Sequence, residues 1–217
     1  MTEEFSQQAL PAKCSQCQRP MSTPIVCDSC RTLHPIPALA DYYEMLGLEA
    51  KFDLDVEHLR SRFLAVSRST HPDFHGGDDP EAQLLSLRLS AAINDAYRTL
   101  LDPVARAGYL LELLGGKSAA EEKSVPDGFL DSMMMLQEEL ADAKAEDDQA
   151  TLEKLRTALD NQHDGILRRI GELFREFDES VACRALSEEK LARIRRQTNA
   201  ISYVRKLQSQ LPSRKDR

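Results

Sequence analysis

The stretch Ser69-Thr70-His71-Pro72-Asp73 decides the fold, because it is a short polar break between two segments whose apolar residues recur at helical spacing. Pro72 disfavours helical backbone geometry in the residue before it, so a helix that arrives from the N-terminal side ends at His71. That helix starts after a capping residue, either Asp53 or Asp55. Its buried face consists of apolar residues three and four apart: Val56, Leu59, Phe63 and Val66.

A second helix follows the break after a polar loop at residues 74–79. Asp79 and Pro80 form a typical cap and first-turn pair. The helix then carries a long apolar face made of Leu85, Leu89, Ala92, Ile93, Ala96, Tyr97 and Leu100. Because both helices are amphipathic and the loop between them is short, we expect them to lie antiparallel, with His71-Pro72-Asp73 at the tip.

The rest of the chain adds further helices and no segment with the alternating pattern of a strand. Residues 41–48 form a short apolar turn that ends at Gly47, and Asp102-Pro103 opens a helix that Gly115-Gly116 ends. We therefore predict an all-α fold. Its predicted parts are a cysteine-containing module at 1–40, a helical-hairpin domain at 41–114, a linker at 115–127, a three-helix bundle at 128–210 with helices at 128–145, 148–178 and 187–210, and a tail at 211–217.

Length and composition exclude several classes of protein. A chain of 217 residues suffices for two small domains with buried cores. No apolar run approaches the roughly 18 to 20 residues that span a bilayer, and the acidic start Met1-Thr2-Glu3-Glu4 is unlike a signal or transit peptide. We expect a cytoplasmic protein, or a mitochondrial matrix protein if the chain is a processed eukaryotic one. The net charge of −8 speaks against a chain that wraps nucleic acid.

Charge is divided unevenly along the predicted bundle. Residues 130–160 hold nine acidic and three basic side chains, whereas residues 184–217 hold ten basic and three acidic ones. Opposite blocks on neighbouring helices can pair with one another inside a bundle. The basic segment also interleaves with an apolar stripe, which favours a solvated helix face over a nucleic-acid site.

Four cysteines stand in two close pairs near the N-terminus, Cys14-x-x-Cys17 and Cys27-x-x-Cys30, with nine residues between the pairs. Two such turns offer four thiolates for a tetrahedron, which is the ligand shell of a structural zinc site. A segment this poor in apolar residues has little else to fold around, so we predict one zinc ion per chain. A pair of redox disulfides, an iron site and an iron–sulfur cluster are the alternatives.

Two further residues, His34 and Cys183, could in principle bind a metal but are not expected to be ligands. His34 is close enough in sequence to compete as a ligand, although four cysteines already complete the shell. A filled shell leaves no open coordination position, so we expect a structural metal and not a catalytic one. The fifth cysteine, Cys183, stands alone and is expected to be an inert thiol.

His71 and Asp73 could be taken for an acid–base pair. The sequence places no serine, cysteine or second carboxylate to act as nucleophile or partner base, and adjacency of His and Asp does not make a catalytic triad. By itself the tripeptide does no more than mark the end of a helix. We therefore predict that the chain is not an enzyme.

The first helix of the predicted bundle has apolar residues outside its core stripe, which consists of Phe129, Met133, Leu136 and Leu140. Leu130 and Met134 lie roughly 100° to 140° around the helix from that stripe, with Glu138 beyond them, whereas Met135 on the other flank suits the core equally well. On the last helix, Tyr203 lies about a third of a turn from its own stripe. An apolar strip edged by a carboxylate is a candidate docking surface, and packing against another helix is the alternative.

The hairpin, its His-Pro-Asp tip and the preceding Tyr-Tyr-x-x-Leu-Gly-Leu turn at residues 42–48 resemble a J-domain, which stimulates ATP hydrolysis by DnaK-type chaperones. A closer likeness, to the HscB-type co-chaperones of iron–sulfur cluster assembly, rests on the segments Ser90–Leu100, Asp102-Pro103, Arg106-Ala107 and Tyr109–Leu111. The start of that family's C-terminal three-helix bundle resembles Phe129-Leu130 and Leu136–Leu140. A subset of the family carries a similar four-cysteine extension, so the likeness covers nearly the whole chain.

The resemblance implies a co-chaperone that docks on a DnaK-type ATPase and delivers the iron–sulfur scaffold protein to it. The chaperone contact would be made by His71, Pro72, Asp73, Arg60 and Arg68. The scaffold-protein contact would be made by Leu130, Met134, Glu138 and Tyr203. Phe74 and His75 stand where J-domains usually have a basic residue, and this departure bears on the chaperone contact.

Two other functions are compatible with parts of this pattern. A general J-protein for unfolded clients would share the hairpin domain and differ in its cargo. A zinc-ribbon nucleic-acid-binding protein would use the basic C-terminal segment, but the net charge of −8 speaks against it.

Overall fold

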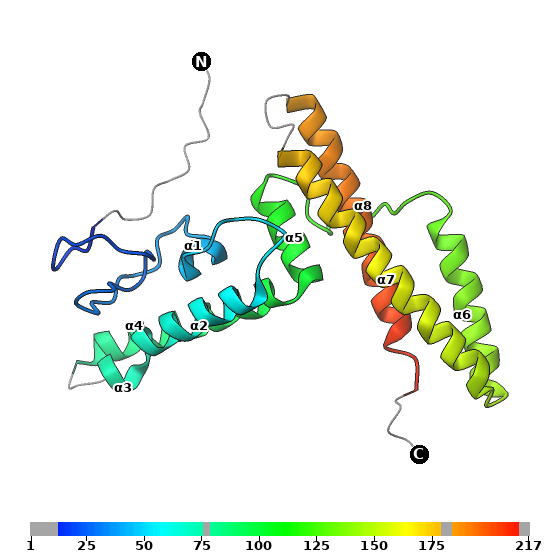
Figure 1. Cartoon of the computed structure of the whole chain (residues 1–217), viewed down its shortest axis with the longest axis horizontal. Coiled ribbons are helices and arrows are strands. Elements are labelled where there is room, and N and C mark those ends of the chain that lie inside the picture. The colour runs from blue at the N-terminus through cyan, green and yellow to red at the C-terminus, as the bar shows by residue number, and fades with distance from the viewer. Residues whose placement is uncertain (1–12, 76–78, 179–183, 213–217) are drawn as a thin grey trace. The chain divides into compact units, whose positions relative to one another are not determined.

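The computed structural model describes residues 13–75, 79–178 and 184–212, apart from the side chains of 178 and 184–187. Within these ranges the chain is helical, with one isolated β-bridge between Val26 and Leu33 (Figure 1), so the all-α prediction is confirmed. Cys183 and the end of the predicted tail lie outside the described residues. By packing, the chain forms two compact units that divide after Asp102.

The first unit contains the cysteine module and four helices: α1 (Tyr42–Leu46), α2 (Val56–Thr70), α3 (Pro72–His75) and α4 (Pro80–Leu101). Aspartates cap three of these helices at Asp41, Asp55 and Asp79. The Asp55 carboxylate accepts hydrogen bonds from the N–H groups of Glu57 and His58 at 2.9 and 3.3 Å, which makes Asp55 the cap of α2 rather than Asp53.

The helices α2 and α4 form the predicted antiparallel hairpin (Figure 1). Ser86 contacts Thr70 at the tip, whereas Tyr97, further along α4, stacks on Phe63, earlier in α2, with ring centroids 4.1 Å apart. The contacts therefore run in opposite directions along the two helices. The apolar residues that are buried in this hairpin are Leu59, Val66, Leu89, Ile93, Ala96 and Leu100. Val56, predicted on the buried face, is 46% exposed in the first turn of α2, so that part of the prediction is wrong.

The polar loop predicted at residues 74–79 begins later than expected. Pro72–His75 form the single turn α3, in which the Phe74 N–H donates to the His71 carbonyl at 3.0 Å. Pro72 ends α2 as predicted, but a proline also suits the first position of a helix, because its φ is already near the helical value. The range 41–114 therefore contains five described helices, one more than the apolar turn at 41–48 and the three longer helices predicted there.

The second unit contains α5 (Pro103–Leu113), α6 (Phe129–Ala145), α7 (Gln149–Asp178) and α8 (Arg184–Gln208). α7 and α8 pack along each other, and α6 packs against both (Figure 1). The buried core between them consists of Phe129, Met133, Leu140, Ala143, Leu152, Leu155, Leu159, Ala200, Val204, Leu207 and Leu211. α8 begins ahead of the predicted start at residue 187. No described helix combines the length and apolar character needed to cross a membrane.

The segment predicted as a linker is tied to α8. The Arg195 Nε donates to the Lys117 carbonyl at 2.7 Å, and the Asn199 Nδ2 donates to the carbonyls of Glu122 and Ser124, both at 2.9 Å. α5 itself packs against α7 and α8, so by packing it is part of the second unit. The functional domain limits at 114 and 128 stay a prediction.

Candidate functional site

The His71-Pro72-Asp73 tip is exposed at the end of the hairpin. The side chains of His71 and Asp73 are 52% and 84% exposed, and the His71 Nδ1 lies 3.6 Å from the Asp73 Oδ2. The Asp73 N–H donates to the His71 Nδ1 at 3.2 Å. Since Nδ1 accepts this hydrogen bond, the neutral ring carries its proton on Nε2 and can donate there to a partner.

Two hydrogen bonds hold the backbone beneath the tip. A ring nitrogen of His75, Nε2, donates to the Ser69 carbonyl at 2.6 Å. The Ser86 hydroxyl, which is fully buried, donates to the Thr70 carbonyl at 2.5 Å. His75, which stands near the position where J-domains have a basic residue, thus fastens α3 to the last turn of α2. Neither contact was predicted, because neither residue is part of an apolar pattern.

One face of α2 beside the tip is basic and partly apolar. Arg60 and Arg68 are both exposed, and Leu64, which is 42% exposed, lies between them at the same four-residue spacing. Residues four apart lie on one face of a helix, so the two predicted arginines are brought together. Leu64 was missed, although its spacing from Arg60 and Arg68 could have indicated it.

The four predicted metal ligands come together in the structure. Their Sγ atoms all lie within 4.8 Å of one another, and the Sγ separations of the pairs Cys14–Cys30 and Cys17–Cys27 are both 3.6 Å. A tetrahedral site with Zn–S bonds of about 2.3 Å has sulfur–sulfur edges of about 3.8 Å. The thiols therefore fit a four-sulfur shell. The 3.6 Å separations exceed a disulfide bond of about 2.05 Å, so the described cysteines are not paired as disulfides.

The two halves of this four-cysteine cluster have the same turn geometry. In the first half, the Cys14 N–H donates to the Arg19 carbonyl and the Gln18 N–H donates to the Cys14 carbonyl. In the second half, the Cys27 N–H donates to the Thr32 carbonyl and the Arg31 N–H donates to the Cys27 carbonyl, and all four distances are 2.8 to 3.0 Å. The N–H two residues after Cys14 or Cys27 donates to the Sγ of that first cysteine at 3.4 Å in both halves. Gln18 and Arg31, each four residues after a first cysteine, both have positive φ, at 61° and 60°. Each half therefore presents its sulfur atoms with the same local geometry.

The surroundings of the individual thiols differ. Hydrogen bonds from Thr32, whose hydroxyl lies 3.1 Å from the Cys30 sulfur, lower the pKa of Cys30 to about 6. A backbone hydrogen bond from Arg19 lowers the pKa of Cys17, but desolvation and the neighbouring thiols outweigh it and raise that pKa to about 11. The His34 Nε2 lies 3.5 Å from the Cys14 sulfur, as a neighbour of the four-cysteine cluster.

The residues predicted to form a docking strip, three on α6 and Tyr203 on α8, are exposed. Leu130, Met134 and Tyr203 are 46%, 62% and 45% exposed, and Glu138 is exposed one turn beyond Met134. The Tyr203 ring meets Phe129 edge to face, with centroids 6.2 Å apart, which places it beside the start of α6. We call Leu130, Met134, Tyr203 and Glu138 the α6 strip. Leu130, Met134 and Tyr203 are not buried against another helix among the described residues, so that alternative is wrong.

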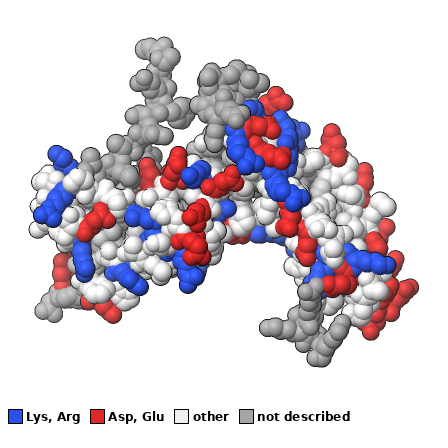
Figure 2. Space-filling model, in the orientation of Figure 1, with Lys and Arg blue, Asp and Glu red and all other residues white. Residues whose placement is uncertain are grey.

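Acidic side chains continue around α6. Figure 2 shows acidic side chains along the edge of the unit that α6 forms. Met135, which suited the core equally well, is 71% exposed and lines a shallow hollow with Glu138, Glu139 and Asp142. Glu138 and Glu139 are exposed on this side of α6. The last helix, α8, packs mainly on α7, where Arg193 lies 3.7 Å from Glu176.

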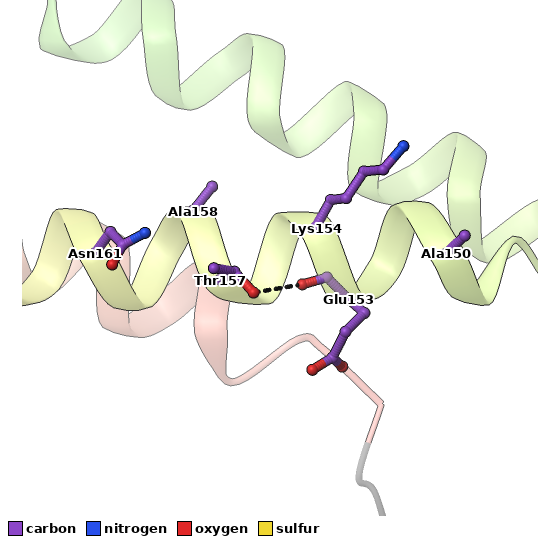
Figure 3. Close-up of a pocket in the computed structure, with 6 residues that line it drawn as sticks. All are labelled: Ala150, Glu153, Lys154, Thr157, Ala158 and Asn161. Carbon is purple, nitrogen blue, oxygen red and sulfur yellow. Dashed lines mark hydrogen bonds between the residues drawn. The ribbon is translucent and has the colours of Figure 1, made fainter.

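A shallow hollow on α7 is lined by Ala150, Glu153, Lys154, Thr157, Ala158 and Asn161 (Figure 3). The side chains of Glu153 and Lys154 point to opposite sides of the helix, and the Thr157 hydroxyl donates to the Glu153 carbonyl at 3.0 Å. These groups do not converge on a common point. The hollow is therefore an ordinary helix surface and supports no catalytic role.

Comparisons with known proteins identify relatives of this chain. Residues 125–212 match the family described as the HSCB C-terminal oligomerisation domain. The co-chaperone protein HscB of Proteus mirabilis (strain HI4320) is 36% identical over 113 residues, which cover 52% of this chain and 65% of that protein. The match thus spans a little under two thirds of the length of this curated relative.

Solved structures extend the likeness to most of the fold. The chaperone HscB from Vibrio cholerae matches with a TM-score of 0.65 and 29% identity, over 79% of this chain and 95% of that one. The human co-chaperone protein HscB matches with a TM-score of 0.67 and 24% identity, over 89% and 96%, and supports the fold alone.

Proposed function

We propose that this chain is an HscB-type co-chaperone, which stimulates the ATPase of a DnaK-type chaperone and delivers an iron–sulfur scaffold protein to it; the match of residues 125–212 and the likeness to a solved HscB structure support this. The curated relative is itself named a co-chaperone. The observation that carries the proposal is the exposed His71-Pro72-Asp73 tip, braced from below and continued by the basic face of α2.

The tip acts on the chaperone as an allosteric contact. A ligand changes a conformational equilibrium only by binding one state better than the other, so the tip and the α2 face must prefer the chaperone state that hydrolyses ATP. His71 supplies a donor on Nε2, Asp73 an exposed carboxylate, and Arg60 and Arg68 two cations. Charged groups of this kind guide association and set orientation, which suits a transient partner.

The test is the steady-state ATPase of a DnaK-type chaperone with and without this chain. His71→Gln should abolish the stimulation, because the substituted side chain has no ring to fill the tip. His58→Gln makes the same change at an exposed position near the start of α2 and is the matched control. Equal stimulation by wild type and His71→Gln would show that the tip is not the contact.

The α6 strip is the proposed scaffold-protein site. Its three exposed apolar side chains and the Glu138 carboxylate form an apolar patch with a charged edge, the usual composition of a docking surface. In calorimetric titration with a scaffold protein, Met134→Glu should abolish binding. Glu138→Arg should weaken it, and Glu139→Arg, which makes the same charge change on another side of α6, should not. Capture of mixed unfolded chains with no binding to the scaffold protein would instead favour the general J-protein.

We also propose that Cys14, Cys17, Cys27 and Cys30 hold one structural zinc ion. The support is the fit of the four sulfur atoms to a tetrahedron and the equivalence of the two turns. Zinc bound there would cross-link two turns that have little apolar core of their own. Elemental analysis of protein purified without chelator should give about one zinc per chain; a value well below one, or iron in its place, would contradict the assignment.

A further inference from the structure

We propose that Arg62 couples the four-cysteine module to α2, so that the bound metal supports the helix that carries the chaperone-docking face. The functional half of this inference rests on the function proposed above. The structural half, a link between metal binding and the order of α2, stands on contacts within the first unit.

Arg62 joins three segments that are distant in sequence. Its Nε donates to the Leu46 carbonyl at the end of α1 at 2.8 Å, and its Nη2 donates to the Ser22 hydroxyl at 3.2 Å. Ser22 in turn is held by Asp28: its N–H and its hydroxyl donate to the two carboxylate oxygens, both at 2.7 Å. A continuous chain of hydrogen bonds therefore leads from α2 to the second cysteine turn.

Asp28 places this chain of bonds inside the metal centre. It stands between Cys27 and Cys30, so the turn that positions Asp28 is the turn that binds the metal. If the metal leaves, the two thiolates lose their common partner and the turn loses the interaction that closes it. Asp28 then no longer holds Ser22, and Arg62 loses one of its two acceptors.

The fit at Gly47 shows how closely these segments approach one another. Gly47 has a φ of 64°, and a Cβ placed on it would lie 2.7 Å from the Ser22 carbonyl oxygen and overlap the Arg62 guanidinium. A glycine is therefore required there for both its backbone conformation and the lack of a side chain. The module is packed directly against the turn and α2 at this point.

The position of Arg62 on α2 separates support from docking. It lies two residues from Arg60, which is roughly 200° around the helix axis. Arg60 and Arg68 are exposed, whereas Arg62 is half-buried. The module thus contacts the side of α2 opposite Arg60, and the proposed docking face stays exposed to solvent. Arg62 is therefore a positioning residue that acts through α2.

The experiment measures amide hydrogen exchange of α2 in the full chain, with zinc bound and after removal of zinc by a chelator. In the wild type, zinc removal should speed exchange of the α2 amides roughly tenfold, the size expected when one hydrogen bond from a charged group is lost. In Arg62→Met, which keeps much of the aliphatic length, α2 should exchange faster even with zinc and should respond little to its removal. Arg60→Met, the same substitution on the exposed face, should respond as the wild type does.

A second variant distinguishes the loss of the Arg62 hydrogen bond from a general destabilisation of α2 by the Arg62→Met substitution itself. Ser22→Ala removes one of the two acceptors of Arg62 without a change in α2. It should abolish the response of α2 to zinc removal, as Arg62→Met does, with a smaller effect on α2 exchange in the zinc-bound protein, while α7 in the other unit serves as the internal reference. The proposal is overturned if zinc removal leaves α2 exchange unchanged in the wild type, or speeds it equally in the wild type and in Arg62→Met. A lack of ATPase stimulation by the wild type would refute the proposed function and leave the exchange result to decide on Arg62.

Discussion

The hydrogen bond from Ser86 to the Thr70 carbonyl gives a quantitative prediction for the tip. Ser86→Ala would leave a carbonyl without its donor in a fully buried position, because the N–H of Phe74 in the next turn bonds to His71 instead. An unsatisfied buried acceptor costs about 1–3 kcal/mol. Alanine returns up to about 0.5 kcal/mol through its higher helix propensity. The net loss of stability should be about 0.5–2.5 kcal/mol.

Native-state hydrogen exchange of the α2 and α4 amides at increasing urea concentration reports the stability of this unit. Ser90→Ala, one turn further along α4, is the matched control, because it gains the same helix propensity at a half-buried position. Subtracting its effect isolates the hydrogen bond. If Ser86→Ala is as stable as Ser90→Ala, the Thr70 carbonyl does not depend on Ser86, and the account of a braced tip is wrong.

Three further predictions concern the metal centre and the bundle. Gln18→Gly and Arg31→Gly should each relieve a left-handed backbone conformation that costs about 1 kcal/mol, and should slow zinc loss to a chelator by similar factors; faster loss would contradict this. While the Thr32 hydrogen bonds to the Cys30 sulfur persist after zinc removal, iodoacetamide at pH 7 should label Cys30 ahead of Cys17, because the pKa of Cys30 is lowered to about 6 and that of Cys17 is raised to about 11; mass spectrometry of peptides labelled at successive times after chelation checks the order, and the preference should fade as the second cysteine turn opens. Asn199→Ala should destabilise the bundle by about 1–3 kcal/mol in urea unfolding, since it removes the donors of two backbone carbonyls.

The features that the sequence predicted correctly have a local, repeated signal. The three- and four-residue spacing of Leu59, Phe63 and Val66 and the Asp-Pro start signals gave α2, α4 and α5. The spacing of the cysteine pairs predicted a cluster, because each pair is short enough to place two sulfur atoms by itself. The exposure of Leu130 and Met134 followed from their angle to the core stripe of α6.

The features that were missed depend on contacts between distant polar residues. Arg62 and Ser22 are forty residues apart, and neither belongs to a periodic pattern that would indicate the other. Asn199 and the carbonyls of residues 122 and 124 are likewise distant in sequence. The segment that contains these carbonyls was predicted to be a linker because its residues are small and polar. Propensity and periodicity describe single elements, whereas these bonds are decided only when two elements meet.

The attachment of residues 117–124 to α8 means that the smallest fragment able to fold as the bundle is longer than the domain recognised by family comparison. That domain covers residues 125–212, but the compact unit starts at Pro103. A fragment cut at residue 125 would leave Arg195 and Asn199 without their backbone acceptors at 117, 122 and 124, and would uncover the surface on which α5 packs. Dissection of this protein should therefore cut after Asp102, the last residue of the first compact unit.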